Sequence, residues 1–155
     1  MGAAFLLAQL GAHAAMRYAE KVAELDLDPA QTGVLHLIAG NPGRSQQALA
    51  DRLGVAPSRV VALVDGLESR GVLERRRSAT DRRTYELHLT SQGDALVRRL
   101  REVAVAHESD VTAALDPDDR RRLVELLRRV ADQQGLTPGV HPGYRRLPPA
   151  PSARE

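Results

Sequence analysis

Residues 45–71 read SQQALADRLGVAPSRVVALVDGLESRG, and two short helical patterns in this stretch decide the fold. Ser45 is a good N-cap for the first pattern, which ends at Gly54. Pro57 fits the first turn of the second pattern, which ends at Gly71. Two short helices joined by a tight turn that contains glycine are typical of a helix-turn-helix.

The second of these helices has one apolar and one outward face. Four apolar residues recur at spacings of three and four, so we expect them to face the core. They are Val60, Leu63, Val64 and Leu67. The residues expected to face outward are Ser58, Arg59, Ala62 and Gly66.

An arginine-rich hairpin follows the helix-turn-helix. We expect strands over 72–77 and 84–89, joined by the loop SATDRR, which is too long for a two-residue turn. Five arginines lie between positions 75 and 83. Residues 44–90 carry nine arginines against six acidic residues, a local charge of +3 in a chain whose formal net charge is +2. The basic surplus therefore lies in this segment.

Four further helical patterns flank this region, so the fold class is mainly α. Apolar periodicity predicts helices over 3–24, 29–39, 91–115 and 117–135. Asp28-Pro29 and Asp116-Pro117 repeat one device, a capping aspartate followed by a proline in the first turn. Residues 136–155 hold five of the nine prolines and no apolar period, which predicts a loosely docked or disordered tail.

Composition excludes several classes of protein. The absence of cysteine excludes disulfide scaffolds, thiolate nucleophiles and cysteine zinc sites. The longest apolar run, Ala3–Ala8, is far shorter than a membrane span, and the N-terminus lacks the basic start of a signal peptide. No nucleophile–base–acid set and no glycine-rich phosphate loop is present. We therefore expect a cytoplasmic, nucleoid-associated protein that is not an enzyme and needs no cofactor.

Residues 44–93 resemble the core of the MarR family of winged helix-turn-helix transcriptional regulators. The sharpest match is Asp81-Arg82-Arg83 in the hairpin, followed by the Leu-Thr-x-x-Gly pattern that ends at Gly93. The resemblance covers about residues 5–133 and implies a small two-stranded wing plus a helical dimerisation region. The chain departs from the family at Ala56, where serine is usual. Two further departures are Val61 and Ala62, where threonine and a polar residue are common.

The resemblance and the charge both point to double-stranded DNA as the partner. Arginines on a projecting loop pair with phosphates, and they are attracted more strongly to a narrow minor groove because its negative potential is enhanced. The second helix of the motif enters the major groove. Asp81 is expected to pair with Arg83 or a neighbour and to hold the guanidinium in one orientation. Arg59 could contact guanine, and Val61 and Ala62 could contact thymine methyls. The candidate DNA contacts are Ser45, Gln46, Gln47, Pro57, Ser58, Arg59, Val61, Ala62, Arg75, Arg77, Asp81, Arg82 and Arg83.

The family's members are homodimers, and this implies three regions in the chain. Residues 1–28 and 91–135 would form the dimerisation region, 29–90 the DNA-binding domain and 136–155 the proline-rich tail. Two-fold symmetry then predicts a palindromic operator. Family members often repress transcription and are released by phenolic or lipophilic effectors. Weak candidates for effector contacts are His13, Tyr18 and His36.

Two alternatives remain open from the sequence. The winged helix could instead bind protein or bind nucleic acid without sequence preference. A metal-responsive regulator would use His36, His107, Glu108 and Asp110, although these residues lack the paired histidines of a helix-borne zinc site. His107 could equally be a buried residue of the dimer. The operator, the effector, the regulated genes and the sign of regulation are not encoded in the sequence.

Overall fold

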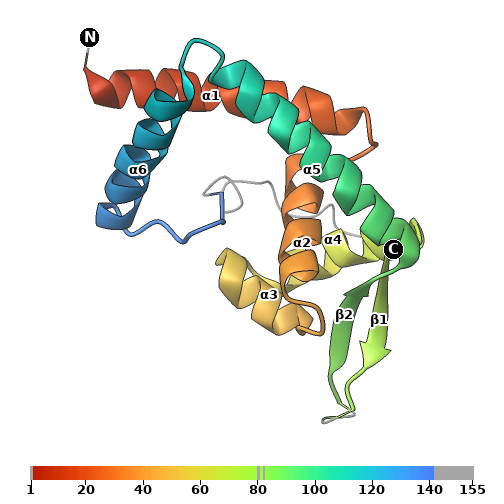
Figure 1. The fold of residues 1–155 in the computed structure, drawn as a ribbon. Coiled ribbons are helices and arrows are strands. Elements are labelled where there is room, and N and C mark those ends of the chain that lie inside the picture. The colour runs from red at the N-terminus through yellow and green to blue at the C-terminus, as the bar shows by residue number, and fades with distance from the viewer. Residues whose placement is uncertain (1, 80, 82, 142–155) are drawn as a thin grey trace, which may run out of the picture.

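The computed structural model describes residues 2–79, 81 and 83–141, which form six helices and one two-stranded sheet (Figure 1). The mainly α winged-helix fold is therefore confirmed. The elements are α1 (Ala3–Ala23), α2 (Pro29–Gly40), α3 (Gln46–Leu53), α4 (Pro57–Ser69), β1 (Leu73–Arg77), β2 (Tyr85–Leu89), α5 (Ser91–Val111) and α6 (Pro117–Gln133).

Helices α1, α5 and α6 form an arch above a compact lobe that contains α3, α4 and the sheet (Figure 1). Helices α1 and α5 pack along each other at the top of the view, and α2 runs down from them to contact α4 and β2. Helix α3 packs on α4, and the sheet projects away from the lobe as a wing. Helix α6 descends at the far end of the arch, apart from the lobe.

The core lies around α2, at the junction of the arch and the lobe. Val34 and Leu35 of α2 are fully buried there. Helix α4 contributes three of the four residues expected to face the core, and Leu63 is only half-buried at its margin. The fully buried residues of α4 are Val60, Val64 and Leu67.

The helix starts lie where the capping residues predict them. Asp28 accepts from the backbone N–H of Gln31 and forms a reciprocal capping box with its side chain. Ser45, Thr90 and Asp116 accept from backbone N–H groups in the first turns of α3, α5 and α6. Ala56 provides no side-chain cap for α4, as the sequence indicated.

The long helix ends four residues before its expected end at 115. Helix α5 stops at Val111, and Thr112 turns its hydroxyl onto the carbonyl of Glu108 at 2.7 Å. Arg120 Nε donates to the carbonyls of Thr112 and Leu115 at 3.2 and 3.1 Å. These bonds satisfy backbone carbonyls at the turn between α5 and α6. The spacing of apolar residues in the sequence could not predict where this turn begins.

A third segment, just before α3, pairs with the outer edge of β2, which the sequence did not suggest. Strands β1 and β2 pair antiparallel with Arg75 opposite Leu87. The N–H of Gly43 donates to the Leu87 carbonyl at 3.0 Å, and the N–H of Leu87 donates to the Arg44 carbonyl at 3.0 Å. An isolated two-stranded hairpin is marginal in water, so the segment before α3 anchors the wing to the lobe.

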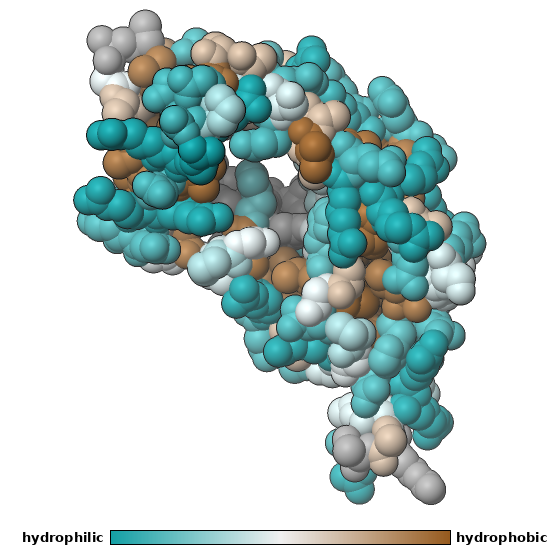
Figure 2. All heavy atoms as spheres, viewed as in Figure 1, coloured by the Kyte–Doolittle hydropathy of each residue, from teal (hydrophilic) through white to brown (hydrophobic). Residues whose placement is uncertain are grey.

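Apolar side chains remain exposed at the far end of the arch. Helix α6 buries none of its residues, and Figure 2 shows hydrophobic residues gathered over α1 and α6. The large exposed ones are Phe5, Leu6, Leu7 and Leu10 on α1 and Leu123, Leu126, Leu127 and Val130 on α6. No helix among the described residues is both long and apolar enough to cross a membrane.

The first residues of the expected tail return to the lobe. Arg52 Nη2 on α3 donates to the carbonyl of Pro138 at 3.0 Å. Val140 is half-buried and packs against the core. Residues 136–141 thus connect the end of α6 to α3, whereas residues 142–155 lie outside the described part of the chain.

A close backbone approach fixes the start of α5 and yields a stability prediction. A Cβ atom at Gly93 would lie 1.9 Å from the carbonyl oxygen of Val72. We expect Gly93→Ala to destabilise the protein by about 1–3 kcal/mol, as overpacking does. At Gly66 an added Cβ meets only Gln31 Nε2, at 3.8 Å. Gly66→Ala should therefore be neutral or stabilise by up to about 1 kcal/mol. Denaturant unfolding compares the two, and equal effects would contradict this account.

Candidate nucleic-acid interface

The start of α4 presents its candidate DNA contacts on the surface. Pro57, Ser58 and Ala62 are exposed, Val61 is 40% exposed and Arg59 is half-buried. Because the opposite side of α4 is in the core, these residues share one outward face. The face carries few hydrogen-bond donors, as expected from its small and apolar residues.

The polar residues that open α3 are already engaged within the protein. Ser45 Oγ accepts from the N–H of Ala48 at 3.2 Å, so its capping role is confirmed. Gln47 Nε2 donates to Asp51 at 2.9 Å. Gln46 Oε1 accepts from Arg75 Nε at 2.9 Å, which turns the amide group of Gln46 toward the wing. A DNA contact by any of them would be additional to these bonds and stays a prediction.

Arg75 is the centre of a cluster that joins three elements. Its guanidinium forms ion pairs with Asp65 and Glu68 on α4 and donates to Gln46 on α3. The backbone N–H of Arg75 donates to Glu68 Oε1 at 3.1 Å. Burial of the guanidinium opposes its charge, but the two carboxylates prevail and raise the pKa of Arg75. The side chain is only 18% exposed, so its main contacts are internal.

The sequence analysis did not identify the partners of Arg75. Asp65 and Glu68 lie three residues apart on α4, a spacing that places both carboxylates on one side of a helix. This pair of acids beside an arginine-rich strand was the only available signal. It could not specify which arginine the acids bind.

The wing tip is built by hydrogen bonds of Asp81. Its carboxylate accepts from the backbone N–H of Arg83 at 2.9 Å, and its carbonyl accepts from the N–H and the hydroxyl of Thr84, each at 3.0 Å. Among the described residues the carboxylate of Asp81 thus meets the backbone of Arg83 and not its guanidinium. An aspartate two residues before an amide forms an Asx-turn, which shapes the backbone instead. Arg83 is exposed, and Arg82 lies outside the described residues.

The remaining arginines of β1 lie along the wing. Arg77 is exposed and places its guanidinium 5.6 Å from the ring centroid of Tyr85, a cation–π arrangement. Arg76 forms an ion pair with Glu74 on the same strand. Arg77 thus keeps its charge uncompensated by any acid among the described residues.

A pair of titratable residues lies at the base of the wing. His88 Nε2 is 3.2 Å from Glu86 Oε2. Hydrogen bonds from Ser78 and His88 lower the pKa of the Glu86 carboxyl, against the smaller opposing effect of burial. Glu86 is therefore a carboxylate at neutral pH, and its hydrogen bond with Ser78 joins β2 to the end of β1.

The effector candidates are dispersed over α1 and α2. His13 is exposed, whereas Tyr18 is half-buried, with its ring 5.5 Å from the ring of His107 on α5. Burial and the neighbouring Arg101 charge lower the pKa of His36. His107 Nδ1 is buried and has no hydrogen-bond partner among the described residues.

The metal alternative receives no geometric support from the described residues. Asp110, one proposed ligand, forms an ion pair with Lys21 at 2.7 Å, and this pairing lowers the pKa of its carboxyl. In the described ranges, no three or more histidine, aspartate or glutamate side chains converge as a metal site would require.

Comparisons with known proteins agree with this architecture. Residues 25–84 match the model of the MarR family. A protein of Thauera aromatica named as a transcriptional regulatory protein for the hcr operon is 39% identical over 110 residues, which are 71% of this chain and 66% of that protein. The chain thus spans about two thirds of the length of that relative.

Two solved structures share most of the fold. The transcriptional repressor CouR, solved bound to a 23-mer DNA duplex, is 36% identical with a TM-score of 0.74, covering 84% of this chain and 92% of CouR. The PcaV transcriptional regulator of Streptomyces coelicolor is 28% identical with a TM-score of 0.71, covering 88% of this chain and all of PcaV. The chain belongs to the MarR family of winged helix-turn-helix transcriptional regulators.

Proposed function

We propose that the protein is a homodimeric, sequence-specific DNA-binding repressor that a small-molecule effector releases from a palindromic operator. The observation that carries the proposal is the geometry of the wing. An exposed Arg83 lies at a tip shaped by Asp81, and Arg75 ties the same wing to α4. A slim basic projection beside a groove-fitting helix suits duplex DNA. CouR, a relative of similar length, was solved on a DNA duplex.

We assign DNA contact and dimerisation to the regions that the sequence indicates. Residues 29–90 would contact DNA, and 1–28 with 91–135 would form the dimer. Pro57, Ser58 and Arg59 would meet base edges in the major groove. Ser45, Gln46 and Gln47 would approach phosphates, and the wing residues would enter the minor groove. We infer a regulatory rather than a catalytic role, with no cofactor.

The exposed apolar faces support a second copy of the chain as the dimer partner. Helix α1 and helix α6 each leave leucines exposed, and a contiguous apolar surface on a protein marks an interaction site. A two-fold axis through this region would direct two wings toward one duplex. Nδ1 of His107, which finds no hydrogen-bond partner in the described part of the chain, lies in the same arch, where a second protomer could supply one.

The proposed effector is a phenolic or lipophilic molecule that binds in the arch. Tyr18 with His107 and, separately, His36 offer polar groups between the arch and the lobe. His13 is exposed and would take part only if the second protomer covers it. Thermal-shift screening of phenols addresses this part of the proposal.

Replacing two arginines separates backbone contact from base reading. Footprinting on DNA upstream of the protein's own gene would first define the operator. Arg83→Ala should weaken binding by about 1.5–3 kcal/mol, the net contribution of a charged hydrogen bond, on operator and random DNA alike. Arg59→Ala should weaken binding by about 1–3 kcal/mol on the operator only. Fluorescence anisotropy measures both, and unchanged binding by Arg83→Ala would refute the role of the wing.

Arg75 tests whether its cluster positions the wing or contacts DNA. Arg75→Gln leaves Asp65 and Glu68 without their cation, so the free energy of unfolding should fall by about 1–3 kcal/mol. DNA affinity should fall without a change in the salt dependence of binding. A lost phosphate contact would instead reduce the slope of log K against log salt by about 1. Arg76→Gln, on the same strand but paired with Glu74, is the control for lost charge.

The dimer is tested by placing a charge on the apolar face of α6. Leu127 is 38% exposed, so Leu127→Glu should leave the protomer folded but convert dimers to monomers. Arg128→Glu changes the charge more, yet lies on the opposite side of the helix and should remain dimeric. Light scattering after gel filtration gives both masses. A monomeric wild type, or a dimeric Leu127→Glu protein, would contradict this interface.

A further inference from the structure

Residues 136–141 cross from the end of α6 to the DNA-binding lobe of the same chain. Figure 1 shows this segment leaving the lower end of α6 and running below the arch toward α3. Helix α6 itself buries none of its residues and lies apart from the lobe. The segment therefore gives the far end of the arch a direct contact with the lobe.

The local sequence ends α6 and turns the chain toward the lobe. Gly135 has a φ of +67°, and its N–H donates to the carbonyl of Asp132 at 3.0 Å. The N–H of Leu136 donates to the carbonyl of Ala131, also at 3.0 Å. These two bonds form a Schellman motif, in which a left-handed glycine ends a helix. The segment thus begins with a defined direction.

A second turn, over residues 137–140, completes the segment. The N–H of Val140 donates to the carbonyl of Thr137 at 3.1 Å, and Gly139 has a φ of +73°. Proline at the second position and a left-handed glycine at the third are typical of a type II turn. Because Pro138 restricts its own φ and Gly139 tolerates a positive one, the sequence itself favours this turn. The turn is therefore a preformed unit.

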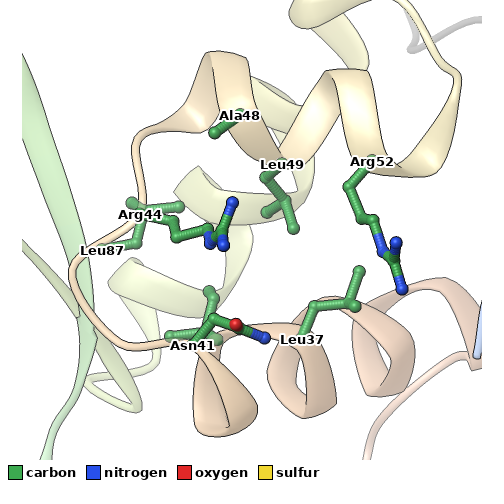
Figure 3. Close-up of a pocket in the computed structure, with 8 residues that line it drawn as sticks. Leu37, Asn41, Arg44, Ala48, Leu49, Arg52 and Leu87 are labelled. Atoms are coloured by element: carbon green, nitrogen blue, oxygen red, sulfur yellow. The ribbon is translucent and has the colours of Figure 1, made fainter.

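Two contacts hold this turn against the lobe. Arg52 Nη2 donates to the carbonyl of Pro138 at 3.0 Å, and Figure 3 shows the Arg52 side chain descending from α3 toward α2. Val140 is half-buried and packs against the core, whereas residues 136–139 are exposed. The turn thus meets the lobe through one charge-assisted hydrogen bond and one apolar side chain.

We propose that residues 136–141 form a strap that restrains the DNA-binding lobe relative to α6 and that docks or releases as one unit. Moving α3 away from α6 must break the bond to Pro138 and withdraw Val140 from the core. Both contacts lie in one short turn, so the loss of either weakens the hold on the other. One hydrogen bond and one half-buried valine are also weak enough to open reversibly.

The effect of the strap on DNA affinity rests on the proposed function, whereas its docking does not. A restrained lobe samples fewer orientations, so it loses less conformational freedom when it binds a duplex. Release of the strap should therefore weaken operator binding. The docking itself is tested first, on the full chain without DNA.

NMR relaxation of the amides of Gly139 and Val140 reports whether the turn is docked. In the wild type their order parameters should match those of α3, at about 0.85, and in Arg52→Ala or Val140→Ser they should fall below about 0.6. Two controls should keep the wild-type values. Arg99→Ala removes an exposed arginine from α5, and Leu136→Ser removes an exposed apolar side chain from the strap itself. The amide spectrum of α3 reports whether each variant is folded.

A distance measurement tests the restraint on the lobe. The chain has no cysteine, so introduced cysteines carry spin labels at chosen positions only. Gln47→Cys on α3 and Gln133→Cys on α6 are exposed positions, and dilution with unlabelled chains limits the signal to distances within one chain. The width of the distance distribution from pulsed EPR should at least about double when Arg52→Ala or Val140→Ser is added. The two controls should leave it unchanged.

The outcomes separate the strap from the proposed function. Flexible wild-type amides, docked amides in both variants, or an unchanged distance distribution would each overturn the strap. Operator affinity, measured by fluorescence anisotropy, should fall by about threefold or more in both variants. A fall confined to Arg52→Ala would assign Arg52 to phosphate contact, and unchanged or tighter binding would refute the effect on affinity. A docked strap in a protein that fails to bind DNA would refute the proposed function alone.

Discussion

The placement of the wing relative to α4 depends on the ion-paired side chain of Arg75. A short hairpin has little stability of its own, and this one is held by an edge segment and by the Arg75 cluster. The guanidinium joins β1 to two carboxylates of α4 and to Gln46 at the start of α3. Rotation of the wing would separate these groups and leave partly buried charges unpaired, which is costly. The three elements of the motif are therefore fixed together by side chains as well as by core packing.

The arginines of the hairpin consequently have different tasks. Arg75 forms ion pairs with two carboxylates of α4, Arg76 forms an ion pair with Glu74, and Arg77 lies against the ring of Tyr85. Arg83 is exposed on a turn whose backbone is fixed by Asp81. Charge density alone therefore overstates how many cations a partner would meet. The tip, with Arg83, and the end of β1 nearest to it, with Arg77, carry the charge that is available to a ligand.

The sequence predicted the helices and strands better than it predicted the contacts between them. Caps such as Ser45 and Asp28, and the apolar period of α4, depend on neighbours within one turn, so local sequence specifies them. The family resemblance added the wing and its order along the chain. The side-chain partners of Arg75 and the strand-like pairing of Gly43 join different elements of the fold. Several arginines were equivalent in sequence, so only the fold could distinguish them.

Arg52 connects features that a periodicity argument treats as separate. It belongs to α3 and donates to the carbonyl of Pro138, in the segment that follows α6. Since α3 also carries Gln46, the partner of Arg75, this one helix holds the segment after α6 at one of its ends and the wing at the other.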